Sequence, residues 1–345
     1  MRLGYSVGGI GSAAQLATLD ELIRKAERLG YDSIWSSEVS GTDPVSVLGW
    51  LAARTERVAL GSAVLQISAR AAVTAAATAL TLQRLSGGRL ILGLGTSGPQ
   101  VVEGWHGQPY GRPLARARDY VAVLRMAMAG EPISYCGQTL ALPLPGGQAT
   151  EMPMASAHGV QPPPVYLAGI GRAAVALAGE LGDGWLGIHC PPSYVSQARG
   201  WLADGAARRG HSLEAFTVAV MVQVLILDDH DLARDMMRPW LALFLGGMGT
   251  RQTNYYNRLA GQLGFRTAAS RVQEAYLAGD LDEAMAALPD DLVDEMSVCG
   301  PADHVRRRLA AYDAAGTDVL IAGIVAPTAA MRHEQLERLA ELTRG

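Results

Sequence analysis

Apolar residues recur along this chain in two patterns that alternate from one end to the other. In residues 18–30 they have the spacing of one helical face, and the segment ends in a glycine, which is typical of a helix C-terminus. Residues 32–35 follow directly and predict a strand. A helix followed by a strand is therefore the repeating unit that the pattern indicates. The helical face consists of Leu19, Leu22, Ile23, Ala26 and Leu29.

The same unit continues to the C-terminus. The other strand-like segments are short apolar runs without strict two-residue alternation, which is typical of strands buried on both faces of a parallel sheet. Eight strands are predicted, at residues 1–9, 32–35, 57–66, 89–95, 165–168, 184–188, 216–227 and 318–324. Helices are predicted at residues 18–30, 44–54, 71–85, 113–129, 172–181, 193–208, 303–315 and 329–342.

Two segments interrupt the alternation. Residues 133–164 are rich in proline and glycine, with a hairpin expected around Gly137, and residues 231–297 contain helix-like segments without an obvious strand. Eight strands that alternate with helices favour a closed barrel over an open sheet. We therefore predict the α/β class and a (β/α)8 TIM barrel, with insertions after strands 4 and 7. The whole chain, residues 1–345, is expected to form a single domain.

Composition and charge narrow the range of functions and partners that the chain could have. With 49% hydrophobic residues, 40 glycines and only three phenylalanines, the 345-residue chain is expected to have many tight turns and an aliphatic core. The formal net charge is −4, and the one dense basic run, at residues 306–308, falls in a predicted helix. Nucleic acid is therefore not an expected partner, because phosphate contacts need clustered cations.

The cysteines and the N-terminus indicate the compartment. Cys136, Cys190 and Cys299 are odd in number and far apart, so neither a disulfide framework nor a metal knuckle is expected. The first residues predict a strand rather than a signal peptide. No apolar run reaches the roughly 18 residues that a membrane span needs. We expect a cytoplasmic protein without a membrane partner.

Metal and hydrolase chemistry are not expected. The seven histidines show no H-x-x-x-H spacing, and no carboxylate cluster accompanies them. The chain contains no G-x-S-x-G, and Cys190 is followed by two prolines rather than by a nucleophile motif.

A glycine-rich run follows the fourth predicted strand. Residues 93–98 match the G-x-G-x-x-G of dinucleotide-binding proteins. In that motif the third glycine begins a helix, whereas here residues 99–109 are expected to form a loop. We therefore interpret the run as a loop at the mouth of the barrel.

A second glycine pair follows the fifth predicted strand and leads directly into a helix. Gly169 and Gly171 would let backbone N–H groups approach an anion, the helix would direct its positive end at it, and Arg172 could supply a counter-charge. A phosphate site is the functional interpretation. A tight turn between strand and helix is the simpler alternative.

Several stretches together resemble the bacterial-luciferase-like superfamily, in its branch of coenzyme F420-dependent oxidoreductases. They are SGGRLILGLGTSGPQVVEGW (residues 86–105), GQPYG (107–111), the segment 166–185 and YDSIW (31–35). The resemblance covers nearly the whole chain except residues 229–297. It implies a deazaflavin ring that lies across the strand ends of the barrel.

The resemblance also implies which residues contact this cofactor. The phosphate is expected on Gly169, Ile170, Gly171 and Arg172, and a non-prolyl cis peptide behind the ring is expected at Ala63-Val64. Residues from three further strand ends, together with Gly187, should border the cofactor. They are Glu38, then Thr96, Ser97, Gly98, Gln100 and Val101, and finally Trp185.

Four residues near the predicted mouth are candidate catalytic proton donors. They are Glu38, Glu103, His106 and His189, with Tyr110 and Cys190 as weaker candidates. Each has a simpler interpretation, which is a cap for Glu38, a solvated loop residue for Glu103, a surface residue for His106 and a lining residue for His189. The acid–base histidine and glutamate of the family's sugar-phosphate dehydrogenases are replaced by Val39 and Gly98, which argues against that substrate class.

The sequence thus favours an F420-dependent oxidoreductase that transfers a hydride between the deazaflavin C5 and a small organic substrate, in the reductase direction. Two alternatives stay open: an FMN-dependent monooxygenase with a partner flavin reductase, and a barrel that binds a cofactor or phosphorylated ligand without turnover. The segment 238–244 could form a homodimer contact, or it could pack within the chain. Substrate choice is expected to reside in the strand-to-helix loops and the two insertions.

Overall fold

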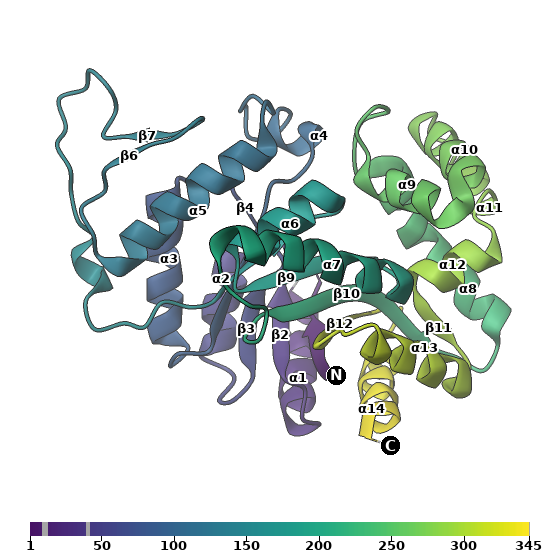
Figure 1. Ribbon diagram of the computed structural model, residues 1–345. Coiled ribbons are helices and arrows are strands. Elements are labelled where there is room, and N and C mark those ends of the chain that lie inside the picture. Colours follow the sequence, from purple (N-terminus) through teal and green to yellow (C-terminus); the bar gives the residue numbers. More distant parts are fainter. Residues whose placement is uncertain (9–12, 39–41, 345) are drawn as a thin grey trace.

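The computed structural model describes residues 1–8, 13–38 and 42–344 (Figure 1). Among them, eight parallel strands form a closed ring, because β10 pairs with both β9 and β12. Each of the eight predicted strands overlaps one of these, so the predicted (β/α)8 barrel is confirmed. The ring contains β1 (Arg2–Ser6), β2 (Ser33–Ser36), β3 (Ala59–Ser62), β5 (Leu90–Gly95), β8 (Val165–Ala168), β9 (Gly184–Ile188), β10 (Thr217–Ile226) and β12 (Val319–Ile324).

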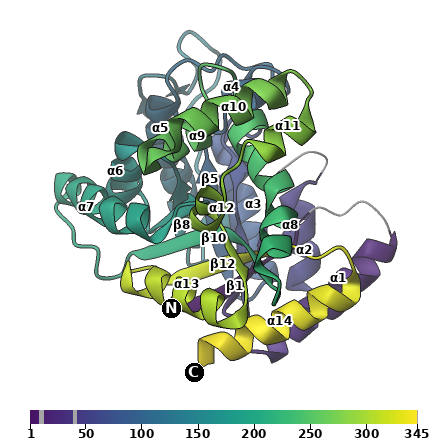
Figure 2. The same ribbon diagram turned by 90° about the vertical axis from the view of Figure 1, so that its right-hand side faces the viewer.

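Helices surround the ring and bury one apolar face each against it (Figures 1 and 2). In Figure 2, α1 and α14 lie side by side, and the Tyr31 hydroxyl donates to the Leu336 carbonyl at 3.1 Å. None of the described helices combines the length and apolar character that a bilayer crossing requires. The outer helices are α1 (Ala13–Arg28), α2 (Pro44–Ala52), α3 (Ala72–Leu85), α5 (Pro113–Ala129), α6 (Arg172–Leu181), α7 (Pro192–Arg209), α13 (Ala302–Ala314) and α14 (Ala329–Arg344).

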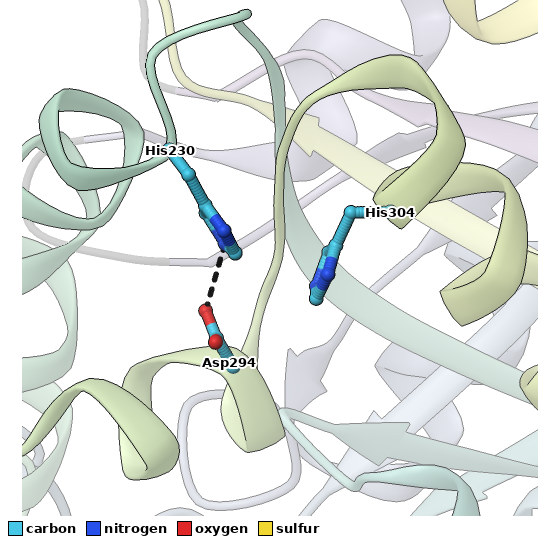
Figure 3. A group of neighbouring side chains, drawn as sticks. All are labelled: His230, Asp294 and His304. Carbon is cyan, nitrogen blue, oxygen red and sulfur yellow. Dashed lines mark hydrogen bonds and ion pairs between the residues drawn. The ribbon is translucent and has the colours of Figure 1, made fainter.

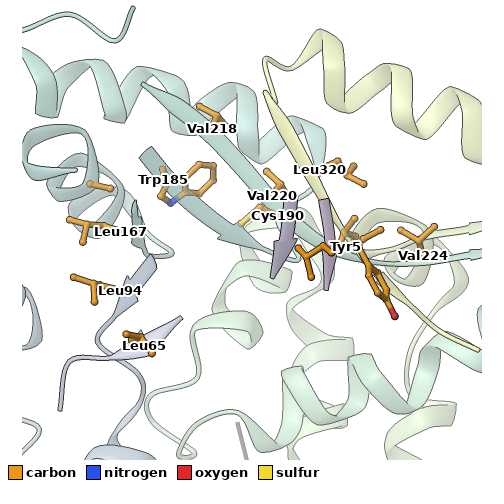
Figure 4. Close-up of a cluster of buried hydrophobic side chains, with 14 of the residues drawn as sticks. Tyr5, Leu65, Leu94, Leu167, Trp185, Cys190, Val218, Val220, Val224 and Leu320 are labelled. Atoms are coloured by element: carbon orange, nitrogen blue, oxygen red, sulfur yellow. The ribbon is translucent and has the colours of Figure 1, made fainter. Parts of the chain in front are cut away.

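Side chains fill both the inside of the ring and the layer outside it. Inside, Trp35 is fully buried, with its ring 6.2 Å from that of Tyr166. A Cβ at Gly61 would lie only 2.1 Å from an atom of the Trp35 ring, so a glycine is required there. Figure 4 shows part of the outer layer, where Trp185 and Val218 pack between strands and helices. The barrel is therefore a packed core whose site can form only at an end of the strands.

Two predicted segments differ in detail. Residues 57–66, predicted as one strand, form β3 and β4 (Leu65–Gln66), and β4 pairs with β5. Residues 99–109 were expected to form a loop, but α4 (Pro99–Val102) makes one helical turn there. Pro99 favours this turn because its fixed φ suits the first helical position.

The first insertion lies beside α3 and α5 (Figure 1). It contains the hairpin expected around Gly137, formed by β6 (Tyr135–Cys136) and β7 (Ala141–Leu142), followed by the short helix η1 (Ala155–Ala157). The carboxylate of Asp119 on α5 accepts hydrogen bonds from the Tyr135 hydroxyl at 2.9 Å and the Thr139 hydroxyl at 2.8 Å. These bonds hold the hairpin against the barrel helix.

The second insertion is helical, as predicted, and lies on the opposite side of the barrel in Figure 1. It ends in β11 (Val298–Gly300), a strand absent from our prediction, which pairs with the last residues of β10. The segment therefore leaves one strand and returns beside the same strand. Its elements are α8 (His230–Ala242), the π-helical η2 (Leu243–Gly247), α9 (Tyr255–Ala260), the π-helical η3 (Gly261–Phe265), α10 (Arg266–Leu277), α11 (Leu281–Ala286) and α12 (Asp290–Met296).

Candidate functional site at the strand ends

The carboxyl ends of the parallel strands bring several predicted site residues to one end of the barrel. Glu38 follows β2 and is fixed by two neighbours: its Oε2 accepts from the Gln66 N–H at 2.7 Å, and its Oε1 accepts from Arg70 at 2.6 Å. The Gln66 amide donates in return to the Glu38 carbonyl at 2.8 Å. With both carboxylate oxygens engaged, Glu38 is placed to join two loops. Val39, the neighbouring position in our prediction, lies outside the described residues.

The backbone after β3 has the expected conformation, because the peptide bond between Ala63 and Val64 is cis. Gly95 at the end of β5 leaves room for the Val64 side chain. A Cβ at Gly95 would lie 2.5 Å from Cγ2 of Val64. The glycine thus allows the Val64 side chain to approach the end of β5.

The loop after β5 contains an unusual backbone and an unpaired amide. Ser97 has a φ of 57°, which is uncommon for a residue other than glycine. Gly98 caps α4, and the buried Gln100 Oε1 has no hydrogen-bond partner. Gln66 Oε1 is also buried and unpaired. Buried acceptors without a donor are costly, so these two amide oxygens would gain from a hydrogen bond donated by a ligand.

The turn between β8 and α6 has the geometry expected of an anion site. Gly171 has a φ of 91°, and no side chain caps the N-terminus of α6. The Gly171 N–H donates to the Tyr194 hydroxyl at 2.7 Å, and Trp185 donates to the Gly169 carbonyl at 2.9 Å. We call residues 169–172 the phosphate turn, after the ligand that the sequence predicts for it.

Two residues of our cofactor prediction take different positions around this turn. Trp185 is fully buried between β9 and the helices, so it supports the phosphate turn from behind rather than bordering the mouth. Arg172 is 73% exposed and pairs with Asp204 on α7 at 3.2 Å. An anion at this turn would therefore meet the positive end of α6 and backbone N–H groups rather than a free guanidinium.

A small gap in the packing lies near the ends of β5 and β8, lined mostly by apolar residues of these strands and of α5 and α6. Its volume is about 30 Å³, and Leu94, Val121 and Leu177 are among its lining residues. A cavity of this size holds about one water molecule.

Two of the candidate proton donors lie in the segment after α4. His106 is half-buried, and its Nδ1 lies 2.8 Å from the Ser68 hydroxyl, which leaves Nε2 as the available ring nitrogen. Glu103 is exposed and accepts a hydrogen bond from the Tyr110 N–H at 3.1 Å. Both groups are accessible to solvent.

His189 takes a different position. Its side chain is 1% exposed, its Nδ1 lies 3.2 Å from the Met296 carbonyl, and its ring centroid lies 4.3 Å from that of Phe244. Burial lowers the pKa of His189 to about 4. The ring is therefore neutral at pH 7 and enclosed, which argues against proton donation to a substrate.

Burial also disfavours the two weaker candidates, Cys190 and Tyr110, because it raises the pKa of each. Burial raises the pKa of the Cys190 thiol to about 12, so it stays protonated. Burial raises the pKa of Tyr110, whose hydroxyl makes a short hydrogen bond with that of Tyr255. This tyrosine pair joins the loop after β5 to the second insertion. Sequence offered no signal for it because the two residues are 145 positions apart.

Comparison with known proteins agrees with this geometry. A protein of Mycobacterium tuberculosis, whose name assigns it to the coenzyme F420-dependent oxidoreductases, is 40% identical over 328 residues, covering 93% of this chain and 94% of the relative. The 5,10-methylenetetrahydromethanopterin reductase of Archaeoglobus fulgidus is 26% identical, covering 88% of this chain and 89% of the relative.

The fold has a similar solved structure, the coenzyme F420-dependent tetrahydromethanopterin reductase of Methanopyrus kandleri. It has a TM-score of 0.80 and 21% identity, and the match covers 99% of this chain and 97% of the other. The profile of the luciferase-like monooxygenases matches residues 3–319. With this match and a relative at 40% identity, the chain belongs to the luciferase-like monooxygenase family.

Proposed function

We propose that this protein is an F420-dependent oxidoreductase that transfers a hydride between C5 of the deazaflavin and a small organic substrate, in the reductase direction. The 40% identity to an F420-assigned relative over 93% of the chain carries this proposal. The reductase name of the Archaeoglobus fulgidus relative supports the direction. We further propose that the barrel and both insertions act as one domain, in which the insertions select the substrate.

The residues at the strand ends fit such a cofactor. A Cβ at Gly169 would lie 2.7 Å from that of Ala174, so a side chain there would displace the start of α6. A Cβ at Gly171 would meet no protein atom within 4 Å, so this side of the turn is open. The unpaired amide oxygens of Gln66 and Gln100 suit the N–H groups of a deazaflavin ring.

Each part of the site would then have a separate task. Gly169, Ile170 and Gly171, with the start of α6, would hold a phosphate of the cofactor tail. Ala63 and Val64 would support the ring from behind, and the loop after β5, with Gln100, would bind its edge. F420, when bound, supplies the carbon that donates or accepts the hydride. The protein's contribution is to orient the ring and substrate and to deliver a proton.

His106 is the proton donor that we propose. Glu38 has both carboxylate oxygens engaged, and His189 is enclosed. The Ser68 hydroxyl fixes one nitrogen of His106 and leaves the other available. Glu103 would act as a loop residue that fixes the Tyr110 backbone.

FMN is the second candidate cofactor, because it also ends in a phosphate and the matching family profile is named for monooxygenases. Calorimetric titration of the cofactor-free protein with each compound separates the two. We expect F420 to bind saturably, one molecule per chain, and FMN to bind at least about tenfold more weakly. Saturable binding of FMN without binding of F420 would overturn the proposal.

A turnover assay separates an enzyme from a binding protein. The holoprotein would be incubated with reduced F420 and a panel of enones, imines and dehydroamino acids. Consumption of any one of them establishes catalysis. Saturable F420 binding with every panel member left unchanged would favour the barrel that binds without turnover.

The substitution Gly171→Ala should weaken F420 binding by about tenfold, because a side chain strains this backbone and shifts the N–H groups that face the phosphate. Gly210→Ala is the matched control. Gly210 ends α7 with a φ of 72° and also has no neighbour within 4 Å of an added Cβ. Gly210→Ala should lose about 1 kcal/mol of unfolding free energy and Gly171→Ala about 1–3 kcal/mol, because ψ is 27° at Gly210 and 147° at Gly171. Equal F420 affinity in both variants would show that the phosphate of F420 does not bind at this turn.

A further inference from the structure

Two histidines and an aspartate from three helices meet outside the strand-end site (Figure 3). They are His230 at the start of α8, Asp294 on α12 and His304 in the first turn of α13. One ligand atom from each lies within 4.8 Å of those from the other two. His230 Nε2 is 3.2 Å from Asp294 Oδ1, and the two imidazole centroids are 4.5 Å apart. We call these three residues the His-Asp cluster.

One member of the cluster has an unmet bonding requirement. The Nε2 atom of His304 is buried and has no hydrogen-bond partner. A neutral imidazole with one protonated nitrogen offers a lone pair on the other. A buried nitrogen left in this state costs free energy unless a ligand binds it.

The local backbone and neighbours support the arrangement. A Cβ at Gly300 would lie 2.6 Å from the His230 ring, so the glycine makes room for that ring. Arg234 donates to both oxygens of Asp294, at 3.0 and 2.6 Å, and fixes the orientation of the carboxylate. Oδ1 also faces His230, whereas among the described residues Oδ2 accepts from Arg234 alone, so Asp294 keeps a lone pair on Oδ2 for a cation. The positive charge of Arg234 opposes such a cation and limits its affinity.

An open hollow gives access to the cluster. Asp294 and His304 line it together with Gln262, Glu295 and Arg308. None of its lining residues belongs to the strand-end site described above. The hollow offers room for a water ligand and a path from solvent.

We propose that His230, Asp294 and His304 bind one divalent transition-metal ion of the zinc type. Two imidazole nitrogens and one carboxylate oxygen are a ligand set that Zn²⁺ accepts, with water completing the tetrahedron. The ion would join α8 and α12 of the second insertion to α13 of the barrel. Its role would be to fix the insertion. The sequence predicted no metal site because the two histidines are 74 residues apart.

Cobalt titration of the tag-free chain, stripped with chelator, tests the site. The probe is CoCl2, followed by visible absorption, with Zn²⁺ displacement and thermal unfolding as second readouts. We expect one Co²⁺ per chain, displacement by one Zn²⁺, and a rise in Tm with either ion. Binding no tighter than about 1 mM, or without saturation, would overturn the proposal.

Substitutions locate the ion. His304→Gln and His230→Gln should each weaken Co²⁺ binding at least about tenfold and abolish the metal-dependent rise in Tm. His211→Gln, at an exposed histidine after α7, is the control and should bind as the unsubstituted chain does. The Tm of each metal-free variant shows whether it is folded. Unchanged cobalt affinity in both cluster variants would assign the ion to another place and overturn the proposal.

Discussion

Replacing His106 by Gln should lower kcat for reduction by F420 by about 100-fold or more, with little change in KM. The imidazole is proposed to supply the proton that accompanies the hydride, and Gln cannot supply one. Its Nδ1 is held by Ser68, so the group is oriented before the substrate binds. The measurement is steady-state consumption of reduced F420 with the best substrate of the enone and imine panel.

Two further variants make this result specific. His158→Gln removes an exposed histidine in the first insertion and should leave kcat unchanged. Tyr110→Phe removes the hydroxyl bonded to Tyr255 and should alter KM more than kcat, since that pair joins a site loop to the second insertion. If His106→Gln retains kcat while Tyr110→Phe loses it, then the tyrosine is the donor. Calorimetry should show equal F420 affinity in all three variants.

The second large effect concerns stability rather than turnover. The His189 imidazole titrates near pH 6.5 in an unfolded chain and near pH 4 in its buried native position. Between these values the unfolded state binds a proton that the folded state does not bind. Stability should therefore fall as the pH decreases from about 6.5 to about 4, by roughly 3 kcal/mol from this group. Urea unfolding at several pH values measures the change.

The substitution His189→Asn isolates this contribution. Asn tolerates the left-handed φ of 53° at this position, and its amide can donate to the Met296 carbonyl in place of the ring. The variant should lose part of the pH dependence between pH 6.5 and 4. The other part belongs to groups such as His304, whose pKa is also lowered by burial. A pH dependence identical to that of the unsubstituted chain would show that His189 is solvated in the native state.

The strands of the barrel could be predicted because each depends on local information. The boundaries of β8, β9, α5 and α6 agree with the predicted ones to the residue, since each lies between clear breaks such as Gly182 and Gly130. The strand β11 was missed because it has three residues and owes its existence to the end of β10 rather than to its own composition. The interruption between β3 and β4 was also invisible to apolar periodicity.

The site was predictable in its backbone and less so in its side chains. Glycines are local signals, so residues 169–171 could be identified as a tight turn before a helix, whereas the hydrogen bond from the Gly171 N–H to Tyr194 could not be predicted. The partners of Glu38 and His189 were not predictable, because Arg70 and Met296 lie 32 and 107 positions away. A carboxylate or imidazole in a sequence shows which chemistry is available, whereas burial and partners decide whether it is used. The His-Asp cluster was missed for the same reason.

The return of the chain to β10 after the second insertion has a consequence for how this protein can change over time. Ile226 pairs with Gly300, and the Leu227 N–H donates to the same Gly300 at 3.0 Å, so the two ends of the segment between them are fastened to each other. We expect that a segment of another length could join those ends without moving the barrel strands, provided that its contacts with His189 and Tyr110 are replaced. The segment is thus a replaceable insertion. Exchanging it between relatives would test whether it changes the range of substrates while the barrel stays the same.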